Sequence, residues 1–229
     1  MQKQFGLIMI CTLILSSLAF SDEQKIFTIK GLYALKSAFV ANVSDSDYAK
    51  TGKKGAYDLT YDMDAGFGLG AEMKLTEIKI AKKDIELIGG YSYMVARKIP
   101  QVNGKGKLDG QTVITYKDVE ADNSYININS IYTKARYIFM VKENDPRFYV
   151  SGKIAYNMIS LTGDLKDLAK IDNGIGAGLS IGCILDDEWD MELAMDNIGA
   201  TMKADDGIDD NLKGTYSIAN TSLSLGYRF

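Results

Sequence analysis

The feature that most constrains the fold is a period-two alternation of apolar and polar residues, which recurs in eight segments of the 229-residue chain. Successive side chains of a β-strand point to opposite faces, so each segment predicts a strand with one apolar and one polar face. The segments are residues 25–36, 57–75, 87–95, 131–139, 148–157, 175–183, 189–196 and 215–229. Long and short connections alternate strictly between them, starting with a long one. This pattern predicts an up-and-down antiparallel sheet whose long connections gather at one end.

The polar faces of these segments favour a membrane barrel over a soluble one. In a soluble barrel the apolar face points inward, whereas in a transmembrane barrel it meets lipid and the polar face fills the interior. Here the polar faces combine many Gly and Ser residues with charged residues of both signs. Small residues suit a crowded interior, where opposite charges can pair. The chain is therefore predicted to be all-β, an eight-stranded antiparallel up-and-down transmembrane β-barrel.

A paired charge network is expected inside this barrel. An eight-stranded barrel is only wide enough for its side chains to fill it, so an interior charge needs a partner. Lys30 and Arg228 lie on the polar faces of the first and last segments. The residues predicted for the network are Glu72, Lys74, Glu86, Lys134, Arg136, Lys153 and Glu192.

Aromatic residues on the apolar faces gather near the segment ends, as they do at the two interfaces of a membrane. Beside the short turns and the termini stand Phe27, Tyr137, Phe139, Phe148, Trp189, Tyr227 and Phe229. The opposite belt is expected to contain Tyr33, Tyr61, Tyr93 and Tyr156. These positions predict two aromatic girdles, one at each end of the membrane-crossing strands.

Residues 1–21 are predicted to be a secretory signal peptide, and the barrel domain is expected to occupy residues 22–229. Lys3 supplies a positive start, an apolar run follows it, and small residues precede a plausible cleavage site after Ser21. No later segment has about 18 consecutive apolar residues, so no transmembrane helix is predicted. After cleavage only Cys183 remains of the two cysteines, which excludes an intrachain disulfide.

The composition argues against several functional classes. The chain contains no histidine, which removes most catalytic triads and most zinc sites. The net charge of −4 argues against a nucleic-acid-binding protein. Asp205, Asp206, Asp209 and Asp210 could bind calcium weakly, but their spacing does not match a defined calcium loop. We therefore expect no enzyme activity, no cofactor and no metal.

The chain ends on its last segment with L-S-L-G-Y-R-F, in which Leu223, Leu225, Tyr227 and Phe229 alternate along the apolar face. Together with the signal peptide, the eight segments and the sorted connections, this ending resembles the small bacterial outer-membrane barrels of the OmpA/OmpX type. The resemblance is one of pattern and covers nearly the whole mature chain. It implies location in the cell outer membrane and an assembly signal, formed by these four residues, that the barrel-assembly machinery recognises. The peptidoglycan-binding domain that the OmpA family often adds is not expected here.

Three functions remain open at this stage. The first is a monomeric outer-membrane scaffold, embedded in outer-membrane lipid, whose long loops contact host surfaces, other cells or extracellular proteins. The second is a narrow porin-like channel for small solutes, in which the interior charges rearrange. The third is a soluble periplasmic binding barrel of the lipocalin kind.

Three stretches carry local expectations. Residues 57–75 exceed the roughly 9–11 residues that a strand needs to cross a bilayer, so this strand should project beyond the membrane. Residues 98–123 are expected to be irregular apart from a locally paired centre. Asn127 and Asn129 fall on the apolar parity of the fourth segment. Either the membrane portion starts near Ile131, which we prefer, or a β-bulge shifts the phase.

Overall fold

The computed structural model describes residues 26–45, 55–80, 83–108, 111–121, 123–139, 146–164, 166, 169–204 and 212–229. The predicted signal peptide and the four aspartates of the acidic stretch lie outside these residues. Within the described ranges, no helix is long and apolar enough to span a membrane.

The described residues form fourteen strands. Their bounds are β1 Phe27–Ala34, β2 Ser37–Asp45, β3 Gly55–Met63, β4 Gly66–Ile80, β5 Lys83–Met94, β6 Arg97–Lys98, β7 Gln101–Leu108, β8 Gln111–Glu120, β9 Tyr125–Phe139, β10 Arg147–Thr162, β11 Ala169–Ile171, β12 Gly174–Leu185, β13 Trp189–Ala204 and β14 Leu212–Arg228.

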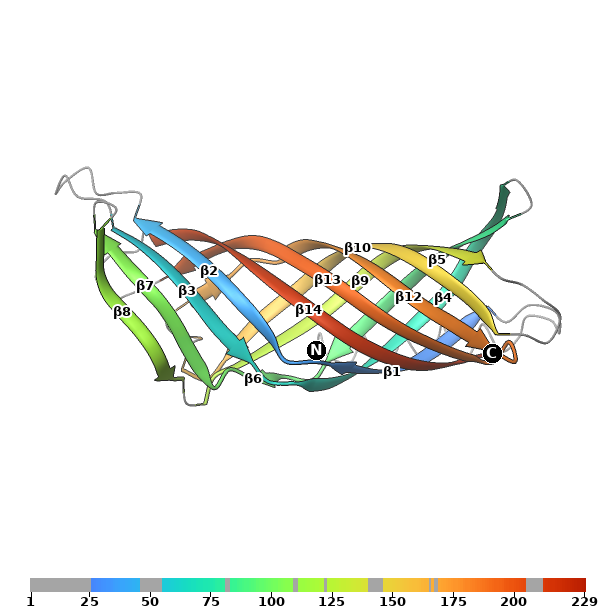
Figure 1. Ribbon diagram of the computed structural model, residues 1–229, viewed down its shortest axis with the longest axis horizontal. Coiled ribbons are helices and arrows are strands. Elements are labelled where there is room, and N and C mark those ends of the chain that lie inside the picture. Colours follow the sequence, from blue (N-terminus) through green and yellow to red (C-terminus); the bar gives the residue numbers. More distant parts are fainter. Residues whose placement is uncertain are drawn as a thin grey trace, which may run out of the picture.

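Eight of these strands close into a ring in which every neighbouring pair is antiparallel. The order round the ring is β1–β4–β5–β9–β10–β12–β13–β14, and β14 returns to pair with β1. Each of the eight predicted segments supplies one strand of the ring, so the predicted eight-stranded antiparallel barrel is confirmed. The strand ends that face the short connections, at β4 and β5, β9 and β10, and β12 and β13, lie at the end that holds the C-terminus (Figure 1).

Four further strands extend the sheet at the opposite end of the barrel (Figure 1). β2 pairs with the first half of β14, β3 pairs with β2, and the hairpin β7–β8 continues from β3. We call β2, β3, β7 and β8, with the parts of the ring strands beside them, the extension. The predicted irregular region 98–123 is mostly this hairpin, and its predicted locally paired centre lies in β8. Among the described strands, β8 pairs with β7 alone, so its outer edge is free.

Two-residue breaks separate the ring from the extension, and each break reverses which side chains face inward. The sequence predicts one continuous strand over 57–75, but the chain breaks after Met63 into β3 and β4, so that prediction is wrong. Odd-numbered residues point inward in β3, where Met63 is 1% exposed, and outward in β4, where Phe67 is 67% exposed. Because strand faces alternate with each residue, a local change of backbone path exchanges the two faces. The same reversal occurs at residues 35–36 and 95–96.

Four ring strands, β9, β10, β13 and β14, cross this level without a break, and their inward side chains change from polar to apolar instead. Along β14 the inward residues run from Arg228 through Ser222 to Ile218. The inward residues of β9, β10 and β13 change in the same way. The register of β9 with β10 is unshifted along the whole strand, so the bulge considered for this segment is absent. Asn127 and Asn129 thus lie on its outward face, beyond the apolar part.

The extension encloses an apolar core of its own. Its buried residues are Phe39, Ala41, Tyr61, Met63, Ile99, Ile126, Ile128, Ile159, Ile198, Tyr216 and Ile218. Burial of apolar side chains stabilises this end of the molecule as it does a soluble domain. Tyr61 is 8% exposed within the core because β3 is reversed, so its predicted place in an outer aromatic belt is wrong.

Candidate functional site

A network of charged side chains fills the middle of the ring, and all eight ring strands contribute a group to it. Four cations face four carboxylates there, and each of these side chains is at most 8% exposed. The charged members are Lys30 of β1, Glu72 of β4, Glu86 of β5, Lys134 and Arg136 of β9, Asp190 and Glu192 of β13, and Arg228 of β14. β10 and β12 contribute Tyr149 and Ser180.

Two lysines and two glutamates form the centre of the network. Lys30 Nζ lies 2.6 Å from Glu192 Oε2 and 3.1 Å from Glu72 Oε2. Lys134 Nζ lies 2.5 Å from Glu72 Oε1 and 2.9 Å from Glu192 Oε2. The hydroxyl of Tyr132 donates a further hydrogen bond of 3.0 Å to Glu72 Oε1. Each ammonium therefore bridges both carboxylates, which offsets the large desolvation penalty of buried charges.

Arg136 joins this centre to the rim at the C-terminal end. Its guanidinium lies 2.6 Å from Asp190 Oδ2 and 3.2 Å from Glu86 Oε2. It also stacks over the ring of Tyr149, with 4.3 Å between Cζ and the ring centroid. The Tyr149 hydroxyl donates to Asp190 Oδ1 at 2.5 Å. Arg228 lies 3.4 Å from Glu86 Oε1, so the network reaches the last residues of β14.

The remaining predicted members, Lys74 and Lys153, lie at the two ends of the network. Lys74 lies 3.2 Å from Glu77 and 3.9 Å from Glu86 at the C-terminal rim. Lys153 lies 2.8 Å from Asp196, on the side nearer the extension. The structure thus brings five of the seven predicted residues into mutual contact inside the ring, whereas Lys153 lies nearer the extension and Lys74 lies at the rim.

Sequence reasoning did not select Asp190, Tyr149 or Ser180 for the network. Asp190 is fully buried and Tyr149 is 1% exposed. Ser180 donates a 2.6 Å hydrogen bond to Glu192 Oε1. All three stand on the inward parity of their strands, so parity alone could have identified them.

Glycines on the inward faces make room for the network tyrosines. A Cβ atom at Gly90 would overlap the ring of Tyr132, and one at Gly182 would overlap the ring of Tyr149. Two large rings can therefore lie across the barrel interior because the facing strands carry no side chain at these positions. This accounts for part of the glycine that the sequence places on the polar faces.

Arg97 of β6, which sequence reasoning did not select, ties the strand breaks together. Its Nε donates to the carbonyl of Asp64 at 2.6 Å, and its terminal nitrogens donate to the Leu35 carbonyl at 2.7 Å and to Asn220 Oδ1 at 3.0 Å. A Cβ at Gly66 would stand 2.7 Å from Arg97 Cγ, so glycine is needed there. Burial lowers the pKa of Arg97, and the negative charge of Asp64 acts in the opposite direction. One side chain thus links two breaks and β14.

Two tyrosines of the extension stay neutral in its apolar core. Burial raises the pKa of Tyr61, and burial together with the charge of Asp172 raises the pKa of Tyr216. The Tyr216 hydroxyl donates to the Asp172 carbonyl at 2.7 Å. The ring of Phe39 packs against both tyrosines, at centroid distances of 5.0 and 5.2 Å.

A polar cavity of about 70 Å³ lies between the charge network and the apolar core. Lys134 and Lys153 line it from the network, and Arg97 lines it from the level of the breaks. Ser130 and Asn157 contribute neutral polar groups, joined by a 2.5 Å hydrogen bond. The interior therefore has three layers along the barrel axis: charged network, polar cavity and apolar core.

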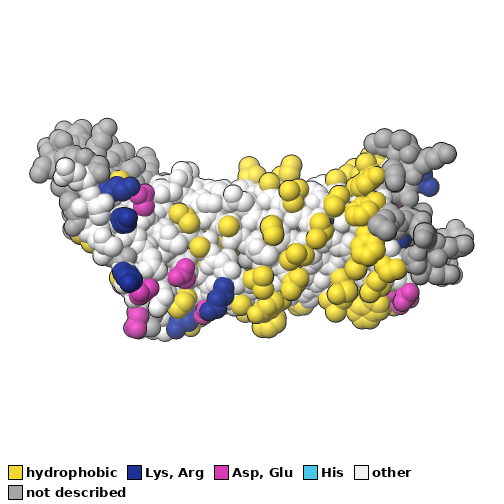
Figure 2. Space-filling view, in the orientation of Figure 1, with side chains coloured by type: hydrophobic (Ala, Val, Ile, Leu, Met, Phe, Trp, Pro, Cys, Tyr) yellow, Lys and Arg dark blue, Asp and Glu magenta, His cyan; other side chains and the backbone are white. Residues whose placement is uncertain are grey.

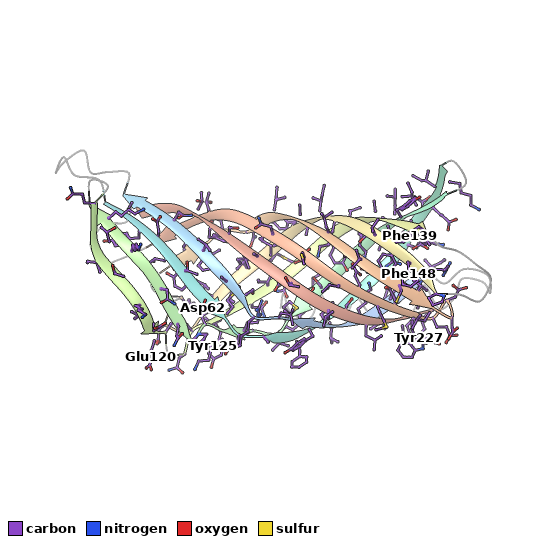
Figure 3. The ribbon with its side chains drawn as sticks, viewed as in Figure 1. Asp62, Glu120, Tyr125, Phe139, Phe148 and Tyr227 are labelled. Carbon is purple, nitrogen blue, oxygen red and sulfur yellow. The ribbon has the colours of Figure 1, made fainter. Side chains whose placement is uncertain are left out.

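The outer surface of the ring is a belt of exposed apolar side chains (Figure 2). Leu179 and Ile175 are 74% and 70% exposed, far more than a soluble protein leaves in so continuous a belt. Figure 3 places Phe139, Phe148 and Tyr227 at the C-terminal end of this belt, where the sequence predicts an aromatic girdle.

The residues predicted for the C-terminal assembly signal lie on the same belt. Leu223, Leu225 and Phe229 are 48–50% exposed, and Tyr227 is partly buried. The Tyr227 ring lies 5.2 Å from that of Trp189 and 5.0 Å from that of Phe229. The predicted signal residues thus also belong to the exposed apolar belt and its girdle, a position that is compatible with an assembly signal and with lipid contact.

No protein-family model matches the sequence. No curated protein matches it either. In structure the chain is similar to the outer membrane protein OprG from Pseudomonas aeruginosa, with 13% identity, coverage of 91% of this chain and 98% of that chain, and a TM-score of 0.49. It is also similar to the outer membrane protein AlkL, studied in DMPC bilayers, with 12% identity, coverage of 92% and 94%, and a TM-score of 0.44. Neisserial surface protein A is similar as well, with 13% identity, coverage of 89% of this chain and 97% of that chain, and a TM-score of 0.40. The predicted resemblance to small outer-membrane barrels is confirmed at the level of fold by the chain's own closed ring of eight strands.

Proposed function

We propose that the protein is an integral outer-membrane barrel that holds the extension outside the membrane as a binding surface for host surfaces, other cells or extracellular proteins. The observation that carries this proposal is the exchange of polarity at the strand breaks. On the C-terminal side the exterior is apolar and the interior charged, as lipid outside requires. On the far side the exterior carries Asn42, Asn197 and Thr215, and the interior is apolar, as water outside requires. A lipid–water boundary at this level accounts for both changes.

The orientation follows from the sorted connections. Outer-membrane barrels turn their short connections to the periplasm and their long ones outward, which places the extension outside the cell. The predicted signal peptide supplies export, and the barrel-assembly machinery supplies insertion. The closed ring leaves no free edge within the belt, which supports a monomer in the membrane.

Membrane location is tested by fractionation and by limited proteolysis of intact cells. We expect the protein to partition with outer membranes, to need detergent for release, and to migrate faster on gels before heating than after. Added protease should cut within the extension and spare the ring. Release from cells without detergent would overturn the membrane assignment in favour of the soluble periplasmic barrel.

The binding surface is tested on β8, whose described side chains are exposed on both sides of the hairpin. Replacing Thr112, Thr115, Lys117 and Glu120 with alanine should leave the barrel folded, because these side chains are exposed. Adhesion of cells displaying the variant should fall relative to cells displaying the original protein at equal surface amount. Alanine at exposed ring positions Leu179 and Ile175 serves as the matched control. Unchanged adhesion to every ligand that the intact protein binds would contradict a binding surface on β8.

A narrow channel is the second candidate, favoured by the polar inner face that runs through the belt. The interior argues against a channel, because the charge network and the apolar core both fill the cross-section of the barrel. Conduction would require Lys134, Arg136 and their partners to separate. Planar-bilayer recording on refolded protein distinguishes the two: stepwise conductance would support the channel, and silence at all voltages would exclude it.

A further inference from the structure

Among the described residues, the interior of the barrel carries six cations and five carboxylates. The cations are Lys30, Arg97, Lys134, Arg136, Lys153 and Arg228, and the carboxylates are Glu72, Glu86, Asp190, Glu192 and Asp196. Lys74, at the rim, has Glu77 as its own partner. Ten of the eleven interior groups lie within 4 Å of an opposite charge.

Arg97 is the interior cation without such a partner among the described residues. Its four hydrogen bonds go to two backbone carbonyls, Asn220 Oδ1 and Ser37 Oγ, all of them neutral. Asp64 offers its carbonyl, while its carboxylate makes no ion pair with Arg97 and is partly exposed, so solvent screens its charge. The Arg97 side chain is 2% exposed, and a buried charge without compensation costs several kcal/mol.

The cavity beside Arg97 has the chemistry and size to supply the missing charge. Lys134 and Lys153 join Arg97 in its lining, and the side-chain amide of Asn220 adds a group that can donate hydrogen bonds. The carboxylates in the same lining are paired already, Glu72 and Glu192 with the two network lysines and Asp196 with Lys153. A cavity of about 70 Å³ has room for one small ion, since about 10–15 Å³ of such volume is enough for one water.

We propose that this cavity binds one small monovalent anion, of the size of chloride, against the guanidinium of Arg97. The anion brings the interior to neutrality at the level where the charge network ends and the apolar core begins. It would hold Arg97 in the position from which it ties the strand breaks together. This site is independent of any ligand of the extension.

The first test locates the ion. Crystals of the refolded barrel grown in sodium bromide are measured at the bromine absorption edge. We expect an anomalous difference peak in the cavity, within hydrogen-bond distance of Arg97. A map without a peak there would overturn the proposal.

The second test measures linkage. A ligand that binds only the folded state raises its melting temperature in a saturable way. Sodium chloride should raise the melting temperature of the barrel by a few degrees more than sodium gluconate at equal ionic strength, because gluconate is too large for the cavity. Equal shifts in the two salts, even with a bromide peak, would mean binding at crystal concentration only and would overturn the proposal.

Arg97→Gln removes the charge while keeping a hydrogen-bond donor, and should abolish the difference between chloride and gluconate. Lys98→Gln is the matched control, since Lys98 is its exposed neighbour and makes the same change of charge outside the cavity. The control should keep the full chloride effect. An Arg97→Gln barrel that keeps it as well would contradict the site, and the bromide experiment remains decisive if this variant does not fold.

Discussion

Arg136 is the residue on which the buried charges near the C-terminal rim depend, since it contacts Asp190, Glu86 and Glu72. Replacing Arg136 with Met should destabilise the barrel by about 3–5 kcal/mol, because the carboxylates stay buried after losing their partner. The measurement is urea unfolding in detergent micelles, followed by heat-modifiable migration and by the fluorescence of Trp189, the single tryptophan.

Lys107→Met is the matched control for this substitution. Lys107 pairs with Asp58 at 2.5 Å in the extension, but both side chains are more than a third exposed. Solvent-exposed pairs of this kind contribute at most about 1 kcal/mol. Losses of equal size in the two variants would contradict the view that burial, and not pairing alone, makes the network important.

Gly90 shows how closely the interior is packed. An added methyl group in Gly90→Ala would overlap the ring of Tyr132, which donates to Glu72. Overpacking of this kind typically costs about 1–3 kcal/mol. Gly152→Ala is the control, since its Cβ would point outward, 4.0 Å from Leu179. We expect the first variant to unfold at lower urea than the original protein and the second to match it. Identical midpoints for both would show that Tyr132 can move aside.

The break between β3 and β4 exchanges the side chains that point into the barrel with those that point outward. Deleting Ala65 leaves one residue in place of two, so β3 can pair with β2 only in a register shifted by one residue, which turns Tyr61 and Met63 outward. The ring should still form, because β4 keeps its partners β1 and β5. The extension should lose its core and become protease-sensitive, by about tenfold in cleavage rate for each 1.4 kcal/mol lost.

Limited proteolysis of the inserted protein measures this effect, with Ala65→Ser as the full-length control. The ring is followed in the same samples by its heat-modifiable migration. An extension as resistant to protease as in the control would show that the two-residue break is not needed for the reversal.

The sequence predicts the ring strands well because each one carries its own alternation. Five of the predicted network residues meet inside the ring, because their inward position follows from parity, whereas Lys74 and Lys153 pair at its margins. The reversal at residues 64–65 leaves no such trace: apolar residues from Tyr57 to Leu75 keep one parity straight through it. What fixes the break is Arg97, 33 residues beyond Asp64 in the chain. The ion-pair partners could not be predicted either, since Arg136 and Asp190 are 54 residues apart and meet across the barrel interior from strands that do not pair.

Across the whole molecule, the polarity of the interior and that of the exterior change together. Where the outside is apolar the inside is charged, and where the outside is polar the inside is apolar. A chain with period-two alternation can satisfy both solvents only if facing or composition changes at the boundary between them. This protein uses both devices. The chain breaks between β1 and β2, between β3 and β4, and between β5 and β6, and the inward residues change from polar to apolar in β9, β10, β13 and β14.

Insertion of the whole barrel is expected to depend on Phe229 more than its stability does. Phe229 is half exposed and contacts Tyr227 and Phe27 by their rings. Deleting it should lower the amount of protein in the outer membrane several-fold if the assembly machinery reads the C-terminal residues. The inserted fraction should unfold at nearly the same urea concentration as the original protein.

Phe148→Ala removes an aromatic ring of similar exposure from the same girdle, 41% against 50%, without altering the C-terminus. A comparable loss of inserted protein in both variants would mean that Phe229 acts as one girdle residue among several. Loss in the deletion alone, with normal refolding into lipid vesicles that lack the machinery, would establish it as an assembly signal.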